Sequence, residues 1–434
     1  MKKNIFVFGL NDFNREQLES LQDADQYQFH GLIALEKLKD AVSYDFPALL
    51  VEAQEQLDSF NGPIDAIINF WDFPSSVLHP FLCERYQLPG PSLKAAILCG
   101  NKGLSREAQQ SIIPDYIPKF SIFDPFEDNP FQKIALDFPF WIKPLLSYSG
   151  YLGFRVTNRE DFSRYLQTIR ESIDRFAEPY ADLLQHADLD SSLTKYTAHH
   201  CIAEEIISAG RQCTVEGYSY QNQVECYGII DSVRYPNMVS FSRYQYPSRL
   251  PESVKQKINA ISKTIIEYIG FDQSAFNIEY FYDETTDRLR LLEINSRISQ
   301  SHALLFKNVD GAPNHRIVLD LGLDNKPQFP HRQGRYACAA KIFARRFEDA
   351  LVTRAPTLNE IDHAQQLVPG ATIVVPVKQD KRLSELLDQD SYSYQYVIAY
   401  LGGDNIHDLA RSYKRVRKAL PFKFKSLAGN INVS

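Results

Sequence analysis

The sequence lacks the cysteine spacings that mark a disulfide framework or a zinc site. None of its cysteines forms a C-x-x-C pair, and all six are scattered along the 434 residues: Cys83, Cys99, Cys201, Cys213, Cys226 and Cys338. Cysteines of this kind predict free thiols in a reducing compartment. We therefore expect a cytoplasmic protein without disulfides or structural zinc.

Long apolar runs are also missing. No stretch approaches the ~20 apolar residues of a membrane-spanning helix, so we expect no membrane segment. The N-terminal "MKKNIFVFGL" has two lysines before a short apolar run, but the ~7–15 apolar residues and small-residue cleavage site of a signal peptide are absent. It predicts a buried N-terminal strand instead.

Positive charge is not in excess. The net charge is −7, which argues against a general nucleic-acid binder, since such proteins are normally basic. Gly9 lacks the partner glycines of a dinucleotide-binding turn, so the first strand gives no support for NAD binding. The hydrophobic share of 44% and charged share of 23% are ordinary for globular proteins. The length predicts more than one domain.

The order of predicted elements indicates an α/β fold. Up to about residue 115, strand candidates (4–10, 27–35, 47–53 and 65–72) alternate with helical stretches (14–22 and 74–86), as in parallel α/β units. From about 116 the sequence becomes β-rich, with a helix at 251–270 and a hairpin at 275–283 and 288–296. The last ~105 residues give short strands and a terminal helix.

The second hairpin strand carries polar residues at every second position. In "RLLEINSR", Glu293, Asn295 and Arg297 share one face because strand side chains alternate. The hairpin register sets Glu279 opposite Glu293 or one step diagonal to it. Facing like charges are destabilising unless a cation lies between them, and carboxylate and amide oxygens suit Mg²⁺. A solvated strand face with the charges splayed apart is the alternative.

Two further segments have features of a nucleotide site. In "FPFWIKPLLSYSGYLGFRV", Lys143 ends an apolar run and is followed by a loop of serines and glycines whose N–H groups could point at phosphate. A flexible hairpin turn is the alternative. In "CIAEEIISAGRQ", the backbone after a strand could offer a carbonyl and an amide to an adenine edge; the alternative is a plain strand–turn–strand with exposed acids.

Together and in this order, the three features resemble the ATP-grasp superfamily, by motif over about residues 90–345. The resemblance implies a Rossmann-like α/β domain at 1–115, an ATP-grasp α+β domain at 116–328 with a mobile lid at about 138–207, and a small β-rich domain at 329–434. It implies ATP and Mg²⁺ as cofactors, with Mn²⁺ as an alternative metal.

The resemblance also assigns site residues. Phosphate would be bound by Lys102, Lys143 and the loop at 147–153, including Ser149 and Gly150. The adenine hinge would comprise Glu204, Glu205 and Ile207, the last two through their backbone. Gln212 stands where many relatives have a ribose-binding glutamate, so that contact is altered. The metal ligands would be Glu279, Glu293 and Asn295, and Arg297 would stabilise the acyl-phosphate or tetrahedral intermediate.

The tail after Arg297 departs from the biotin-carboxylase-like branch. That branch has E-x-N-x-R followed by Q-V-E-H, whereas this chain has "ISQSH", so Ser301 replaces the carboxylase glutamate. His302 is retained but fits a packed histidine equally well, and Lys341 is a candidate second cation.

The resemblance therefore implies an ATP-dependent ligase that joins a small-molecule carboxylate to an amine or a thiol, without a nucleic-acid partner and with a homodimer allowed. A bicarbonate-activating carboxylase and a non-catalytic ATP-binding module are the alternatives.

Overall fold

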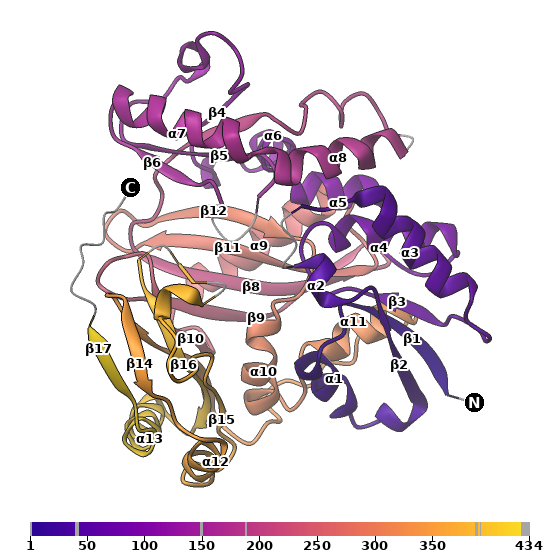
Figure 1. Cartoon of the computed structure of the whole chain (residues 1–434). Coiled ribbons are helices and arrows are strands. Elements are labelled where there is room, and N and C mark those ends of the chain that lie inside the picture. The colour runs from indigo at the N-terminus through magenta and orange to yellow at the C-terminus, as the bar shows by residue number, and fades with distance from the viewer. Residues whose placement is uncertain are drawn as a thin grey trace.

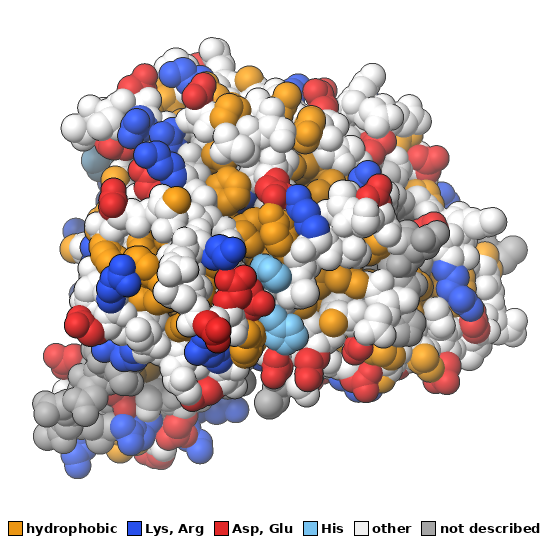
Figure 2. All heavy atoms as spheres, turned by 90° about the horizontal axis from the view of Figure 1, so that it is seen from above, with side chains coloured by type: hydrophobic (Ala, Val, Ile, Leu, Met, Phe, Trp, Pro, Cys, Tyr) orange, Lys and Arg blue, Asp and Glu red, His pale blue; other side chains and the backbone are white. Residues whose placement is uncertain are grey.

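The computed structural model describes residues 2–39, 43–147, 151–186, 189–386, 389–390 and 392–426. Within them the chain forms a small parallel sheet, a four-stranded antiparallel sheet, a long antiparallel sheet and a two-stranded ribbon (Figure 1). Acidic and basic side chains are interspersed over the face seen from above (Figure 2). No helix in the described ranges has the length and apolar character needed to cross a membrane.

The N-terminal region is a parallel α/β unit, as predicted. Its sheet has the order β2-β1-β3, and its strands are β1 (Lys3–Phe8), β2 (Tyr27–Leu32) and β3 (Ala66–Ile68). The helices of this part are α1 (Asp12–Glu19), α2 (Leu35–Leu38), α3 (Phe46–Asp58), α4 (Ser75–Arg85), α5 (Leu93–Gly100) and α6 (Lys102–Ile112). The predicted N-terminal strand is confirmed as β1, whose last four residues are buried.

The strand predicted at 47–53 is wrong, because this segment lies inside α3. Asp45 caps the helix by accepting a hydrogen bond from the Ala48 N–H, and Pro47 lies in the first turn, where its missing N–H is tolerated. The buried positions continue to Leu57 with helical spacing. The short apolar run alone did not distinguish a buried strand from the first half of an amphipathic helix.

The second layer is an antiparallel sheet of order β4-β7-β5-β6, here called the lid sheet. Its strands are β4 (Phe120–Phe123), β5 (Phe140–Pro144), β6 (Phe154–Val156) and β7 (Cys201–Glu205). Two consecutive helices, α7 (Arg159–Ser172) and α8 (Asp174–His186), connect β6 to the segment before β7 and lie above the large sheet in the view of Figure 1.

The large sheet has eight antiparallel strands in the order β12-β11-β8-β9-β10-β13-β16-β15. Their bounds are β8 (Arg211–Tyr220), β9 (Gln223–Arg234), β10 (Phe241–Tyr246), β11 (Ser274–Asp283), β12 (Arg288–Asn295), β13 (Cys338–Arg346), β15 (Thr372–Val374) and β16 (Tyr394–Gly403). The ribbon pairs β14 (Ala350–Arg354) with β17 (Lys423–Ser426). The remaining helices are α9 (Glu252–Ile269), α10 (Ala303–Val309), α11 (His315–Gly322), α12 (Leu358–Gln366) and α13 (Ile406–Ala419).

The two faces of this sheet differ in character. Helix α9 packs on the outer face, where Cys213, Val215, Ile278 and Tyr280 are buried with its isoleucines. The alternate residues of the same strands point to the inner face, which carries Gln212 on β8 and Glu279 on β11. Since β13, β15 and β16 extend the same sheet, the C-terminal region continues it without a break. The domain division at 328/329 stays a prediction.

Candidate active site

The hairpin of β11 and β12 aligns the two predicted metal-binding carboxylates. Glu279 pairs directly with Glu293, and Asn277 pairs with Asn295, so the predicted cross-strand register is confirmed. A bulge follows at once, because Tyr280 pairs with Leu291 and one residue of β12 is left unpaired.

The carboxylate pair has the electrostatics of a cation site. Burial, and next the facing Glu293, raise the pKa of Glu279 to about 7. Gln212 donates its amide to Glu279 Oε2 at 2.9 Å. Asn295 Nδ2 donates to Asn277 Oδ1 at 2.9 Å, which leaves the Asn295 amide oxygen available as a ligand. No cluster of three or more His, Cys, Asp or Glu side chains suited to a metal occurs in the described ranges, but two carboxylates and an amide fit Mg²⁺ completed by phosphate oxygens and water.

Two lysines approach this pair from the other side of the site. Lys102 is the first residue of α6, and its ammonium donates to the Ser147 carbonyl at the start of the predicted phosphate loop. Burial lowers the pKa of Lys102 to about 8; Glu293 opposes this shift and Lys143 adds to it. Lys102 is therefore close enough to Glu293 and Lys143 for their charges to interact.

Glu204 lies at the centre of a buried ion pair. Its oxygens lie 2.6 Å from Arg106 Nε and 2.6 Å from Lys143 Nζ. Burial raises the pKa of Glu204, but the two cations outweigh it and hold the pKa at about 2. Arg106 also donates to the carbonyls of Leu291 and Leu292 on β12. Arg106 on α6 thus links Glu204 of the lid sheet to β12.

The segment between β7 and β8 is fixed by backbone contacts. The N–H of Glu205 donates to the Lys119 carbonyl at 2.9 Å, and Ile207 follows in the connection to β8. Arg234 donates to the carbonyls of Ser208 and Gly210. Gly210 has φ +79°, and a Cβ there would lie 2.2 Å from the Tyr282 carbonyl oxygen, so only glycine fits.

Of the other residues predicted to bind the nucleotide, Gln212 is described by the structure and two are not. Gln212, the residue at the predicted ribose position, directs its amide at Glu279, one of the predicted metal ligands. Ser149 and Gly150 lie outside the described residues.

Arg297 is paired with the N-terminal α/β unit. Its Nε and one terminal nitrogen donate to the two oxygens of Asp72 at 2.9 and 2.8 Å. Asp72 lies just after β3, at the carboxyl end of a parallel strand, where ligand-binding residues of α/β sheets gather. Arg297 therefore forms a salt bridge in this structure, and its remaining terminal nitrogen donates to the Ile298 carbonyl at 3.4 Å.

The chain after Arg297 is held by a buried acid. Glu216 is fully buried and accepts hydrogen bonds from the Ser299 N–H, from His302 Nδ1 at 2.7 Å and from the Tyr227 hydroxyl at 2.9 Å. His302 is thus a packed, hydrogen-bonded residue. Ser301 accepts from Lys341 Nζ at 2.9 Å.

Arg106, Asp72 and Glu216 were not among the predicted site residues. Arg106 and Asp72 become relevant only through partners 98 and 225 residues away. Asp72 did carry a usable signal, because it ends a predicted parallel strand.

The lid sheet over a large antiparallel sheet, with Lys102 within electrostatic reach of Glu293, resembles the ATP-grasp fold. Residues 205–323 match the family described as "Carbamoyl-phosphate synthase L chain, ATP binding domain". No curated protein sequence matches the chain.

Several solved structures are similar to this chain over almost its whole length. It is similar to L-amino acid ligase from Bacillus licheniformis at 16% identity and TM-score 0.74, over 98% of this chain and 99% of that one. Phosphoribosylglycinamide synthetase from Anaerococcus prevotii matches at 12% identity and TM-score 0.61, over 98% and 100%. Biotin carboxylase from Campylobacter jejuni matches at 13% and 0.64, over 98% and 92%. At these identities the likeness establishes the fold.

Proposed function

We propose that the protein is an ATP-dependent ligase that joins a carboxylate to an amine through an acyl-phosphate and releases ADP and phosphate. The observation that carries this proposal is the Glu279–Glu293 pair, directly opposed on the inner face and within electrostatic reach of Lys102. Two facing carboxylates would destabilise a merely structural hairpin, whereas they suit a site that receives a metal–nucleotide complex.

In this proposal the nucleotide lies between the lid sheet and the inner face. Lys102 and Lys143 neutralise the phosphate oxygens, and the loop containing Ser149 and Gly150 adds backbone donors. The backbone of Glu205 and Ile207 contacts the adenine. The Glu204 carboxylate is engaged by Arg106 and Lys143, so its role is to position Lys143.

The metal ligands in the proposal are Glu279, Glu293 and Asn295, with Mg²⁺ as the metal and Mn²⁺ as the alternative. When bound, the ion supplies positive charge against the ATP phosphates. Gln212 keeps one oxygen of Glu279 oriented by its 2.9 Å hydrogen bond, and Asn277 does the same for the Asn295 amide.

The chemistry needs no protein nucleophile. A substrate carboxylate oxygen attacks the γ-phosphorus of ATP, the bond to the bridging oxygen breaks, and ADP leaves with that electron pair. Arg297, oriented by Asp72, stabilises the acyl-phosphate with its remaining N–H groups. The amine then attacks the acyl carbon, phosphate leaves with the C–O electron pair, and the amine loses a proton to give an amide.

A carboxylase that activates bicarbonate is the second candidate. In its favour is the fold shared with biotin carboxylase. Against it, the position of the expected acid is Ser301, and that hydroxyl is bonded to Lys341. A cation beside a hydroxyl suits an anionic substrate group better than proton removal from bicarbonate. A non-catalytic ATP-binding module would have no use for an opposed carboxylate pair.

The test is a phosphate-release screen with MgATP over pairs of amino acids and small acids, with bicarbonate as a separate arm. We expect release that requires an acid and an amine together, and its loss in Glu293→Gln. Glu284→Gln is the matched control, because this exposed glutamate lies in the turn of the same hairpin. Release that needs bicarbonate and ignores amines would favour the carboxylase. Absence of release in every arm would favour the non-catalytic module.

The proposal also includes the cellular compartment and the oligomeric state of the enzyme. We infer a cytoplasmic enzyme acting on small molecules, with a homodimer as the assembly to test by light scattering.

A further inference from the structure

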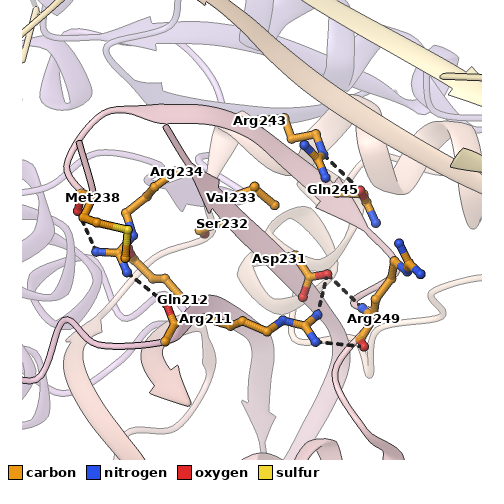
Figure 3. A pocket seen from close by; sticks show the side chains of 11 residues that line it. Arg211, Gln212, Asp231, Ser232, Val233, Arg234, Met238, Arg243, Gln245 and Arg249 are labelled. Atoms are coloured by element: carbon orange, nitrogen blue, oxygen red, sulfur yellow. Dashed lines mark hydrogen bonds and ion pairs between the residues drawn. The ribbon is translucent and has the colours of Figure 1, made fainter. Parts of the chain in front are cut away.

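A cavity of about 490 Å³ lies beside the first residues of β8 and reaches Gln212, the residue that donates to Glu279 (Figure 3). Its volume falls within the ~300–1,000 Å³ typical of small-molecule sites. Its charged and polar lining includes Arg211, Asp231, Arg234, Arg243, Gln245 and Arg249. Four arginines and one acid line it, although the whole chain is acidic with a net charge of −7.

Part of the charged wall of this cavity belongs to the outer face of the sheet, whereas Gln212, Ser232 and Arg234 line it from inner-face positions. Asp231 on β9 pairs with Gln245 on β10, and two residues along β9 Val233 pairs with Arg243. The intervening β10 residue, Tyr244, points to the inner face, where its ring lies 5.3 Å from that of His302. Gln212 likewise points inward to Glu279. Because strand side chains alternate, Asp231, Arg243 and Gln245 point away from the proposed catalytic site.

The single acid is already fully engaged within the fold. Asp231 accepts from the Ser248 hydroxyl at 2.5 Å, from the Arg249 backbone N–H at 2.9 Å and from Arg211 at 3.3 Å. Arg211 also pairs with Glu284 at 3.1 Å. The hydrogen bonds of Asp231 are therefore made within the fold, and its ion pair is with Arg211.

Arg243 and Arg249 retain positive charge that the fold does not neutralise. In the described part of the chain, neither has a carboxylate within ion-pair distance. Arg243 Nε donates to the Gln245 amide oxygen at 3.1 Å, and Gln245 is only 2% exposed. Burial lowers the pKa of Arg243; Asp231 opposes this and the like charge of Arg249 adds to it. Two guanidinium groups thus repel each other across a partly desolvated cavity.

We propose that this cavity is a second ligand site, which binds a small phosphate-bearing anion between Arg243 and Arg249. Planar guanidinium groups bind phosphate oxygens bidentately, and a phosphate dianion can accept from two of them at once. The volume exceeds that of a single phosphate, so the natural ligand is an organic phosphate whose remainder occupies the space beneath Val233 and Arg211. The proposal does not depend on the ligase reaction, because Arg243 lies on the opposite face of the sheet from Glu279.

The test uses inorganic phosphate as the probe and isothermal titration as the readout. The double variant Arg243→Gln/Arg249→Gln should weaken phosphate binding by at least about tenfold, since hydrogen bonds to charged groups are lost. The matched control is Arg411→Gln/Arg415→Gln, which removes two exposed arginines of α13. It should bind phosphate as the unaltered chain does. Lys102→Gln/Lys143→Gln removes the phosphate contacts of the proposed ligase site and leaves the two arginines in place, so phosphate binding at the cavity should persist in it.

Several results would overturn the proposal. They are the absence of phosphate binding to the unaltered chain, binding that survives in Arg243→Gln/Arg249→Gln, and binding lost only in the lysine variant. Acetate, which offers one carboxylate, should compete poorly, and equal competition would contradict the phosphate class. If the double variant does not fold by thermal melting, the exposed Arg249→Gln alone carries the same expectation.

Discussion

Metal binding at the carboxylate pair should depend on pH through Glu279. Burial and Glu293 raise the pKa of Glu279 to about 7, so below pH 7 a divalent cation must displace a proton from it. Affinity should then fall by about tenfold for each pH unit below 7 and level off above it. Titration of Mg²⁺ into the protein at pH 6 and pH 8 measures this difference.

Substitutions at the same pair distinguish the effect of the Glu293 charge on the pKa of Glu279 from the role of Glu279 as a metal ligand. Glu293→Gln removes the facing charge, which lowers the pKa of Glu279 and moves the onset of the pH dependence to more acidic values. Glu279→Gln should bind weakly at both pH values. Equal Mg²⁺ affinity of the unaltered protein at pH 6 and pH 8 would contradict the assignment of Glu279 as a ligand.

The buried ion pair of Glu204 should contribute strongly to stability. Glu204→Gln keeps the shape but leaves Arg106, which is 3% exposed, without its counter-charge. Breaking a buried pair from one side typically costs about 3–5 kcal/mol in the free energy of unfolding. Urea denaturation measures it. Glu205 is a partly exposed neighbour, and Glu205→Gln should lower the free energy of unfolding by less than about 1 kcal/mol. Similar losses of stability in both variants would contradict a large contribution from the buried ion pair.

Single residues were predictable from the sequence where the signal was local. Glu279 and Glu293 followed from strand alternation and hairpin register, both of which depend on neighbouring residues. The partner of Arg297 did not follow, because Asp72 lies 225 residues away and only the tertiary fold brings the segment after β3 to the segment after β12. The engagement of Glu204 by Arg106 was hidden for the same reason.

At the level of elements, the hairpin was predictable and α3 was not. Within residues 275–296, apolar and polar side chains alternate in two segments on either side of a polar turn. The strand pattern and the turn signal therefore both predict a hairpin. Residues 47–53 are apolar at adjacent positions, and only the cap at Asp45 and the buried Leu57 reveal the helix. The misassigned segment lies outside the candidate site, so the error left the site prediction unchanged.

The contact between the loop after β3 and the end of β12 should matter for turnover. Asp72 holds the Arg297 fork by two hydrogen bonds. Asp72→Asn keeps one acceptor and loses the charge, so the guanidinium is less well oriented. We expect kcat to fall by about tenfold or more, with nucleotide affinity unchanged, because positioning errors act on the transition state.

Steady-state phosphate release and nucleotide titration measure the two quantities separately. Asp12→Asn, at an exposed position in the first turn of α1, is the control and should leave both unchanged. If Asp72→Asn changes nucleotide affinity and leaves kcat intact, Arg297 acts on nucleotide binding and our assignment of it to the acyl-phosphate is wrong.

At the scale of the whole molecule, the large sheet contains strands from two regions that were predicted to be separate domains. The resemblance implied a separate domain from 329 onward, whereas β13 pairs with β10 through Arg243–Ile342 to Tyr246–Ala339. A buried hydrophobic cluster also includes residues from both sides of the predicted boundary at 328/329, since Ile230 and Tyr246 pack with Ala339 and Tyr400. Local patterning identified each strand but carried no information on which sheet it would join.

Removal of residues 336–434 tests whether this region is a domain or part of one folding unit. The truncated chain would leave β10 as an unpaired edge and expose the apolar side chains that now contact Ala339 and Tyr400. Such an edge promotes aggregation. We expect the truncated chain to aggregate, and the full chain to unfold in urea in one transition seen equally by circular dichroism and by tryptophan fluorescence. A soluble truncated chain that keeps its nucleotide affinity would support the boundary at 328/329 and would mean that the pairing of β10 with β13 contributes little to the stability of the site.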